Sequence, residues 1–141
     1  RKGNAIEGRL GLIIDGTGRE YDKIVKQSIQ LKQLGYDTHM IFVNTSLDTA
    51  LLRNSERSRT VPEDIAIKSW KDVQSNIGKF SQHFRQSFIV VDNNDSKEDV
   101  MTPVFKQIKS LLKKKVNSPR ASAWIEMEMK RRGITKKPKG F

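Results

Sequence analysis

Three short apolar runs, each followed at once by polar residues, alternate along this chain with longer amphipathic stretches. The runs and their polar clusters are 10–14 with 15–19, 38–43 with 44–46, and 88–91 with 92–95. Short apolar runs between glycine or polar breaks are typical of buried strands, and strands that alternate with helices favour a parallel sheet with right-handed crossovers. Ligands of such sheets bind at the carboxyl ends of the strands. The sequence therefore predicts an α/β fold with a doubly wound parallel sheet and a functional edge at these three clusters.

Five amphipathic stretches predict the helices, the last two of which follow the sheet as C-terminal helices. The longest has an apolar stripe whose members are alternately four and three residues apart: Ala66, Trp70, Val73, Ile77, Phe80 and Phe84. The residues expected to start or stop the five helices are Gly35, Ser46 or Asp48, Val61-Pro62, Thr102-Pro103, Ser118-Pro119 and Gly133.

Composition narrows the class of protein further. The chain has 141 residues and no cysteine, which is enough for one domain and excludes disulfides, zinc fingers and cysteine nucleophiles. The two histidines, His39 and His83, have no partner at triad or metal spacing, so we expect both to be structural. The sequence has no apolar run near the length of a membrane span and no signal-peptide pattern, and we expect a cytoplasmic protein without membrane contact.

The formal net charge of +11 is concentrated at one end of the chain. Residues 105–141 hold 12 of the 27 Lys and Arg and only 2 of the 16 Asp and Glu. Clustered cations of this kind neutralise nucleic-acid phosphates, but they also form ordinary solvated helix faces. Both interpretations stay open at this point. The candidate nucleic-acid contacts are Lys113, Lys114, Lys115, Arg131 and Arg132.

The strongest local motif is Asp15-Gly16-Thr17-Gly18-Arg19, at the end of the first apolar run. An acid, a hydroxyl and a base in this position can hold a metal-bound water or a substrate hydroxyl, so Asp15 is also the candidate metal ligand. The structural alternative is that Asp15 or Thr17 only caps the following helix. A dinucleotide fingerprint is excluded because position 21 is tyrosine where the third glycine would stand.

Three arginines, Arg53, Arg57 and Arg59, lie in a polar segment between two predicted helices. Arginine binds phosphate oxygens bidentately and stabilises the charge of a phosphoryl group in transfer. The alternative is a solvated connection in which Glu56 is the local partner of the arginines. From composition alone, the solvated connection is the favoured interpretation.

Taken together, the order of these motifs resembles the P-loop kinases of the polynucleotide kinase and zeta toxin branch. The resemblance covers roughly residues 9–95, and its motifs are 12–19, 34–37, 40–43, 50–57 and 61–62. It implies that Asp15 and Thr17 face the acceptor and magnesium, with Arg19 a further substrate contact. It also implies a lid at 53–62, whose Arg53 and Arg57 reach the phosphates of ATP with Arg59 as a third, and an adenine-side loop with Asp92 and Asn93.

The chain departs from this family because it lacks the Walker A loop, with its Lys and Ser/Thr, and the strand with the presumed base Asp that follows that loop in family members. The segment Gly3–Gly8 has the glycine spacing of G-x-x-x-x-G-K-[ST], but it continues with Arg9-Leu10 and precedes an apolar run. We therefore expect the C-terminal part of a P-loop NTPase fold, completed by an N-terminal segment or a split partner chain. Its expected parts are a kinase core over 1–95, a closing helix over 96–116 and a basic helix and tail over 117–141.

The expected function is part of an ATP- and Mg²⁺-dependent kinase acting on a hydroxyl of a nucleotide, a sugar-nucleotide or a nucleic-acid end. As an isolated segment it should bind ATP weakly and transfer nothing. The alternative is a non-catalytic module, nucleic-acid-binding or structural, with a kinase-like scaffold and a basic tail.

Overall fold

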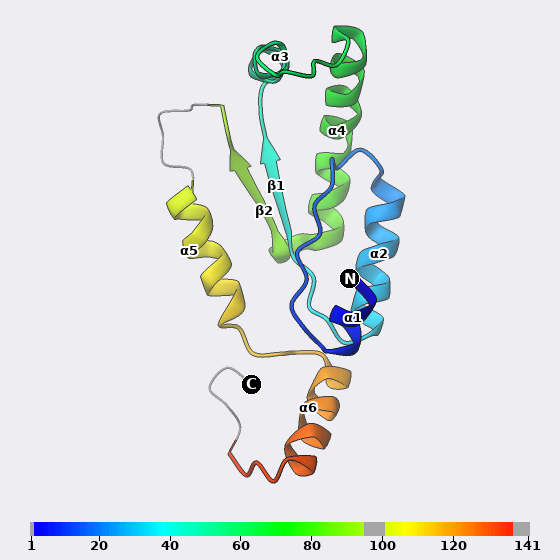
Figure 1. Cartoon of the computed structure of the whole chain (residues 1–141), viewed down its shortest axis with the longest axis vertical. Coiled ribbons are helices and arrows are strands. Elements are labelled where there is room, and N and C mark those ends of the chain that lie inside the picture. Colours follow the sequence, from blue (N-terminus) through cyan, green and yellow to red (C-terminus); the bar gives the residue numbers. More distant parts are fainter. Residues whose placement is uncertain (1, 95–100, 137–141) are drawn as a thin grey trace.

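The computed structural model describes residues 2–94 and 101–136, which form a mixed α/β structure with a small parallel sheet (Figure 1). The elements are α1 (Lys2–Glu7), α2 (Tyr21–Gln33), β1 (Met40–Asn44), α3 (Leu47–Ser55), α4 (Glu63–Phe84), the short 3-10 helix η1 (Arg85–Ser87), β2 (Phe88–Asp92), α5 (Met101–Leu112) and α6 (Pro119–Arg131). Helix α1 has no counterpart among the sequence predictions. No helix in the described ranges is both long enough and apolar enough to cross a membrane.

The sheet consists of two of the three predicted strands. β1 and β2 pair in parallel, with Met40 opposite Phe88 and Asn44 opposite Asp92, which confirms the parallel arrangement. The prediction of a strand over 10–14 is wrong for this structure: the segment has no strand partner, and Ile13 is fully exposed. Figure 1 shows it as a dark blue trace that rises from α1 to the start of α2. Because a strand needs a hydrogen-bonding neighbour, an apolar run alone does not form one. A doubly wound sheet is not confirmed.

The predicted helix ends are mostly confirmed by their capping geometry. Gly35 follows α2 with a φ of +101°, and the backbone N–H of Tyr36 donates to the carbonyl of Leu31, which is the Schellman closure that favours glycine. Ser46 and Ser118 cap α3 and α6 with their side chains. Pro62 is the N-cap of α4 and not its first helical residue, one position from the prediction.

The core lies on one face of the sheet, between β1, α2 and α4. Its buried members are Phe42, Phe80 and Phe84, and the ring of Tyr21 lies 5.2 Å from that of Phe80. These positions confirm the aromatic part of the stripe predicted for α4. The core keeps β1 and α4 together, so it fixes the carboxyl end of the sheet relative to that helix.

The C-terminal end of α2 contacts the segment after α1 and the first turns of α6. The Arg9 guanidinium donates to the carbonyl of Leu34 at 2.8 Å and lies 5.5 Å from the ring centre of Trp124. Arg120, at the start of α6, donates to the carbonyl of Gln33. Two cations therefore satisfy the carbonyl end of α2, where positive charge is favourable. Trp124 anchors α6 to this end.

Candidate functional site

The Asp15–Arg19 loop is held against α4 at the start of α2. Gly18 is buried and has a φ of +73°, a conformation that glycine adopts without strain. The side-chain amide of Asn76 donates to two consecutive carbonyls, that of Gly18 at 3.2 Å and that of Arg19 at 2.9 Å. The loop therefore has a defined conformation, with Asp15, Thr17 and Arg19 exposed on it.

A cavity of about 540 Å³ lies between this loop and β1. Asp15 and Thr17 line it from the loop, and Met40–Val43 line it from the strand. Within residues 2–94 and 101–136, β1 pairs with β2 alone, so its other edge faces this cavity with its backbone groups unpaired by a strand. Arg19, the three lid arginines, Asp92 and Asn93 are not among the residues that line it.

The carboxyl ends of β1 and β2 are joined by a network of polar side chains. The Asn93 N–H donates to the carbonyl of Asn44 at 2.9 Å. Asn94 donates to Asp92 Oδ1 from both its backbone and its side chain, and its own Oδ1 accepts from the N–H of Ser46 at 2.6 Å. One oxygen of Asp92 is thus engaged in shaping the loop, and Asn94 is the residue that links β2 to the start of α3.

The lid arginines lie on two different kinds of structure. Arg53 is half-buried in the last turn of α3, which corrects its predicted place in an irregular segment. Arg57 and Arg59 are exposed in the connection that follows. Asn54 closes the base of this connection through two hydrogen bonds with the backbone of Val61. None of the three arginines forms an ion pair with Glu56 in the described structure, so the expected local partner is not used.

Helix α4 connects the Asp15–Arg19 loop and the carboxyl end of β1 through side chains of its middle turns. The indole N–H of Trp70 donates to the carbonyl of Thr45 at 2.9 Å, and the Gln74 amide donates to Asn44 Oδ1 at 2.7 Å. Asn76 holds the Asp15–Arg19 loop. The sequence predictions missed Gln74 and Asn76. Asn76 carried a usable signal, because it stands three residues after Val73 and four before Phe80, a buried helix position where a polar residue needs partners.

The described residues suit a magnesium site that is shared between the protein and the phosphates of a substrate, and not a site made of protein ligands alone. No group of three or more His, Asp or Glu that could hold a metal occurs among the described residues. Mg²⁺ is commonly held by one or two carboxylates together with substrate phosphates and water. The exposed carboxylate of Asp15, beside the cavity, suits that second arrangement.

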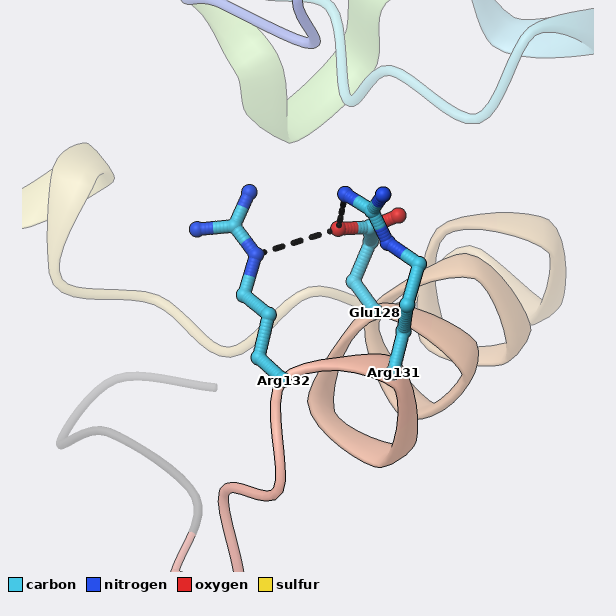
Figure 2. Close-up of polar contacts among 3 residues, drawn as sticks. All are labelled: Glu128, Arg131 and Arg132. Carbon is cyan, nitrogen blue, oxygen red and sulfur yellow. Dashed lines mark hydrogen bonds and ion pairs between the residues drawn. The ribbon is translucent and has the colours of Figure 1, made fainter.

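The predicted nucleic-acid residues divide into two groups. Lys113, Lys114 and Lys115 are exposed just after α5, and none of them forms an ion pair in the described ranges. Arg131 and Arg132 both bind Glu128, at 2.9 and 3.2 Å (Figure 2). Hydrogen bonding to Arg131 is the main cause that lowers the pKa of Glu128, so this carboxylate stays ionised at neutral pH. This carboxylate partly neutralises the positive charge at the C-terminal end of α6.

The two histidines, expected to be structural, lie in different surroundings. His83 Nε2 lies 3.2 Å from the hydroxyl of Ser28, which lies 2.9 Å from the hydroxyl of Thr38. This series of hydrogen bonds contains no carboxylate, and it links α4, α2 and the residues before β1. His39 precedes β1 instead of lying within it.

Comparison with protein families gives one match: the family model described as zeta toxin matches residues 3–103. No curated protein and no solved structure matches the chain. The matched range includes the Asp15–Arg19 loop, the lid arginines and both strands.

Proposed function

Because the chain belongs to the zeta toxin family of nucleotide-binding, P-loop kinases, we propose that it is part of an ATP-dependent kinase. Its acceptor would be a hydroxyl of a nucleotide, a sugar-nucleotide or a nucleic-acid end. The observation that carries the proposal is the open edge of β1 beside the Asp15–Arg19 loop, where the exposed acid and hydroxyl of Asp15 and Thr17 line the gap along that edge. Ligand sites of α/β proteins lie at the carboxyl ends of such strands.

In this proposal the acceptor is bound by the loop and the transferred group by the lid. Asp15 and Thr17 orient the acceptor hydroxyl and Arg19 contacts the acceptor. The hydroxyl oxygen forms a bond to the γ-phosphorus of ATP while the bond to the leaving ADP oxygen breaks. Arg53 and Arg57 stabilise the transferred phosphoryl group, since positioning and charge stabilisation do most of the work in this reaction.

In this proposal, three further residues contact the bound nucleotide. Arg59 is a third phosphate contact, and Asp92 and Asn93 lie toward the adenine. Mg²⁺, which neutralises phosphate charge when it is bound with ATP, would take Asp15 as a ligand together with phosphate oxygens and water.

The phosphate-binding loop would be supplied by a strand that adds to the free edge of β1. This edge is five residues long and lines the cavity, and the opposite wall is formed by the loop at 14–18. Around the gap, Ile13, Ile14 and Val43 are exposed, so an apolar strand inserted there would cover them. We propose that this strand continues into G-x-x-x-x-G-K-[ST] and comes from an upstream segment or a partner chain.

Phosphate transfer from γ-labelled ATP tests both parts of the proposal. The 141-residue chain should transfer nothing alone and gain activity when it is joined to, or mixed with, a segment that carries the Walker A motif. In the active form we expect Asp15→Asn and Arg57→Ala each to lower kcat/KM roughly 100-fold or more. Lys71→Ala, an exposed change on α4, serves as the control.

Two results would count against this function. Transfer by the pure 141-residue chain would contradict the need for the added strand. An assembled form that binds ATP but phosphorylates none of the three acceptor classes would contradict the kinase assignment itself.

A second candidate is nucleic-acid binding by the basic end, favoured by the three exposed lysines at 113–115 that have no ion pair in the described ranges. A salt titration of DNA binding separates the two functions. Affinity that falls steeply with salt, survives Arg53→Ala with Arg57→Ala, and is lost on removal of 113–141 would support this candidate. Affinity that depends on the two arginines would contradict it.

A further inference from the structure

Asn76 is one of two buried polar residues in the described ranges, and it lies on the core-facing side of α4. Asn76 is 5% exposed, and along the helix it lies between Val73 and Phe80. An amide in such a place is costly unless its hydrogen bonds are made. Its hydrogen-bond partners therefore indicate its role, and both belong to the proposed acceptor loop.

The amide nitrogen of Asn76 has two N–H groups, and it uses them on two successive peptide units. The acceptors are the carbonyls of Gly18 and Arg19, 58 and 57 residues away in the chain. In a planar trans peptide the N–H of the next residue points opposite to the carbonyl. Fixing both carbonyls toward α4 thus turns the N–H groups of Arg19 and Glu20 away from it, and the orientation of two peptide planes is set.

The backbone conformation of Gly18 in the same loop explains why these hydrogen bonds are needed there. Gly18 has a φ of +73°, and a side chain at this position would approach Phe42 and Val73 at 3.5 and 3.7 Å. Its left-handed conformation lets the chain bend, but glycine alone also leaves the backbone free to adopt others. The two Asn76 bonds hold the peptides on either side of the Arg19 Cα, and the first of them restrains the peptide that follows Gly18.

We propose that Asn76 is a positioning residue for the acceptor loop: its amide fixes the Gly18 and Arg19 peptides, and so sets where Thr17 and Arg19 meet the acceptor. The inference rests on the proposed function for the roles of those two residues. It goes further because a residue of α4, the helix that starts directly after the lid connection, would then determine how the acceptor loop is oriented.

NMR relaxation of the backbone amides in the full 141-residue chain tests the positioning without any assay of activity. In Asn76→Ala we expect the order parameters S² at 17–20 to fall from roughly 0.85, typical of a rigid backbone, to below about 0.6, while those of β1 and β2 are retained. Gln74→Ala is the matched control, because it removes an amide hydrogen bond from the same helix that goes to Asn44 instead. It should leave the order parameters at 17–20 unchanged.

The variant Asn76→Asp distinguishes a positioning role from a merely structural one. Its protonated carboxyl keeps one donor for the loop carbonyls, whereas its carboxylate has no donor and repels them. The order parameters at 17–20 should therefore fall as pH rises in this variant, compared with wild type at each pH. A loop whose order parameters are the same in all variants would overturn the proposal. So would unfolding of both Asn76 variants at every pH, because the residue would then support the whole fold.

In the assembled kinase, Asn76→Ala should raise the acceptor KM roughly tenfold with the KM for ATP nearly unchanged. An equal rise in both KM values would overturn the acceptor-specific role. Absence of transfer by the wild-type assembly would instead reject the proposed function, and the relaxation results would still decide whether Asn76 fixes the loop.

Discussion

The side-chain amide of Asn54 makes two hydrogen bonds with the backbone of Val61, one in each direction. Asn54 Nδ2 donates to the Val61 carbonyl at 2.8 Å, and the Val61 N–H donates to Asn54 Oδ1 at 3.1 Å. This pair closes the connection that carries Arg57 and Arg59 and joins the end of α3 to the start of α4. The arginine segment is therefore a closed loop with a fixed base and two exposed cations.

Asn54→Ala should open this loop at its base. Both bonds are near the surface, so we expect a loss of only about 0.5–1.5 kcal/mol in the free energy of unfolding. Trypsin should cleave after Arg57 and Arg59 several times faster than in wild type. Ser55→Ala is the control, since its hydroxyl bonds only the local carbonyl of Leu52. Equal cleavage rates in the two variants would show that Asn54 does not close the loop.

Phe80 is the most deeply buried large side chain of the described residues, with 0% exposure, and its ring lies close to those of Tyr21, Phe42 and Phe84. Phe80→Ala should lower the free energy of unfolding by about 3–5 kcal/mol, because it leaves a cavity at the centre of a small core. Urea unfolding measures this change. Ile65→Ala, at a position 49% exposed on the same helix, should cost far less. A similar loss in both would contradict the placement of the core.

The amphipathic patterns predicted the helices well because the residues that carry them are also the ones that pack. Phe80 and Phe84 of the α4 stripe are buried, and the capping residues Gly35, Ser46 and Ser118 lie at helix ends. The run at 10–14 has the same apolar character as β1, yet it forms no strand. Strand formation depends on a neighbour, which the composition of a segment cannot report.

The candidate site was predictable in its location but not in its supports. Two of the three polar clusters, at 44–46 and 92–94, do mark the carboxyl end of the sheet, whereas Asp15 and Thr17 follow no strand and line the cavity beside β1. The residues that hold these segments are amides on helices, Asn54, Gln74 and Asn76, and each acts over a turn or a long distance in the chain. Contacts of this kind depend on how helices pack against loops, which a single sequence does not encode locally.

His83 should make the chain less stable on mild acidification. Burial, and then the charge of Lys32, lower its pKa below the ordinary value of 6.5, so folding favours the neutral ring. The stability that this contributes is present above pH 6.5 and is lost as pH falls through the lowered pKa. We expect the urea midpoint to fall between pH 7 and pH 5.5, and to fall less in His83→Gln.

His39 contributes in the same direction, since burial is also the main cause that lowers its pKa. The double variant His39→Gln with His83→Gln should therefore have the flattest profile over this range. An unchanged slope in the double variant would mean that other groups control the acid sensitivity.

Glu128 should oppose any binding of nucleic acid by the basic end, because it holds Arg131 and Arg132 in ion pairs. Glu128→Gln removes one negative charge and frees both guanidinium groups. If the basic end binds DNA, affinity at low salt should rise, and the slope of log K against log salt should steepen by up to about 2, near 0.9 for each additional phosphate contact.

The matched control for this variant is Glu20→Gln, which makes the same change of charge in an exposed ion pair with Lys23 at the start of α2. A change of overall charge alone would act in both variants, whereas release of the two arginines acts only in Glu128→Gln. Fluorescence anisotropy of labelled DNA over a range of salt concentrations gives both slopes. Equal slopes in the two variants would contradict a nucleic-acid surface at the end of α6, and would leave the basic residues there as a solvated helix face.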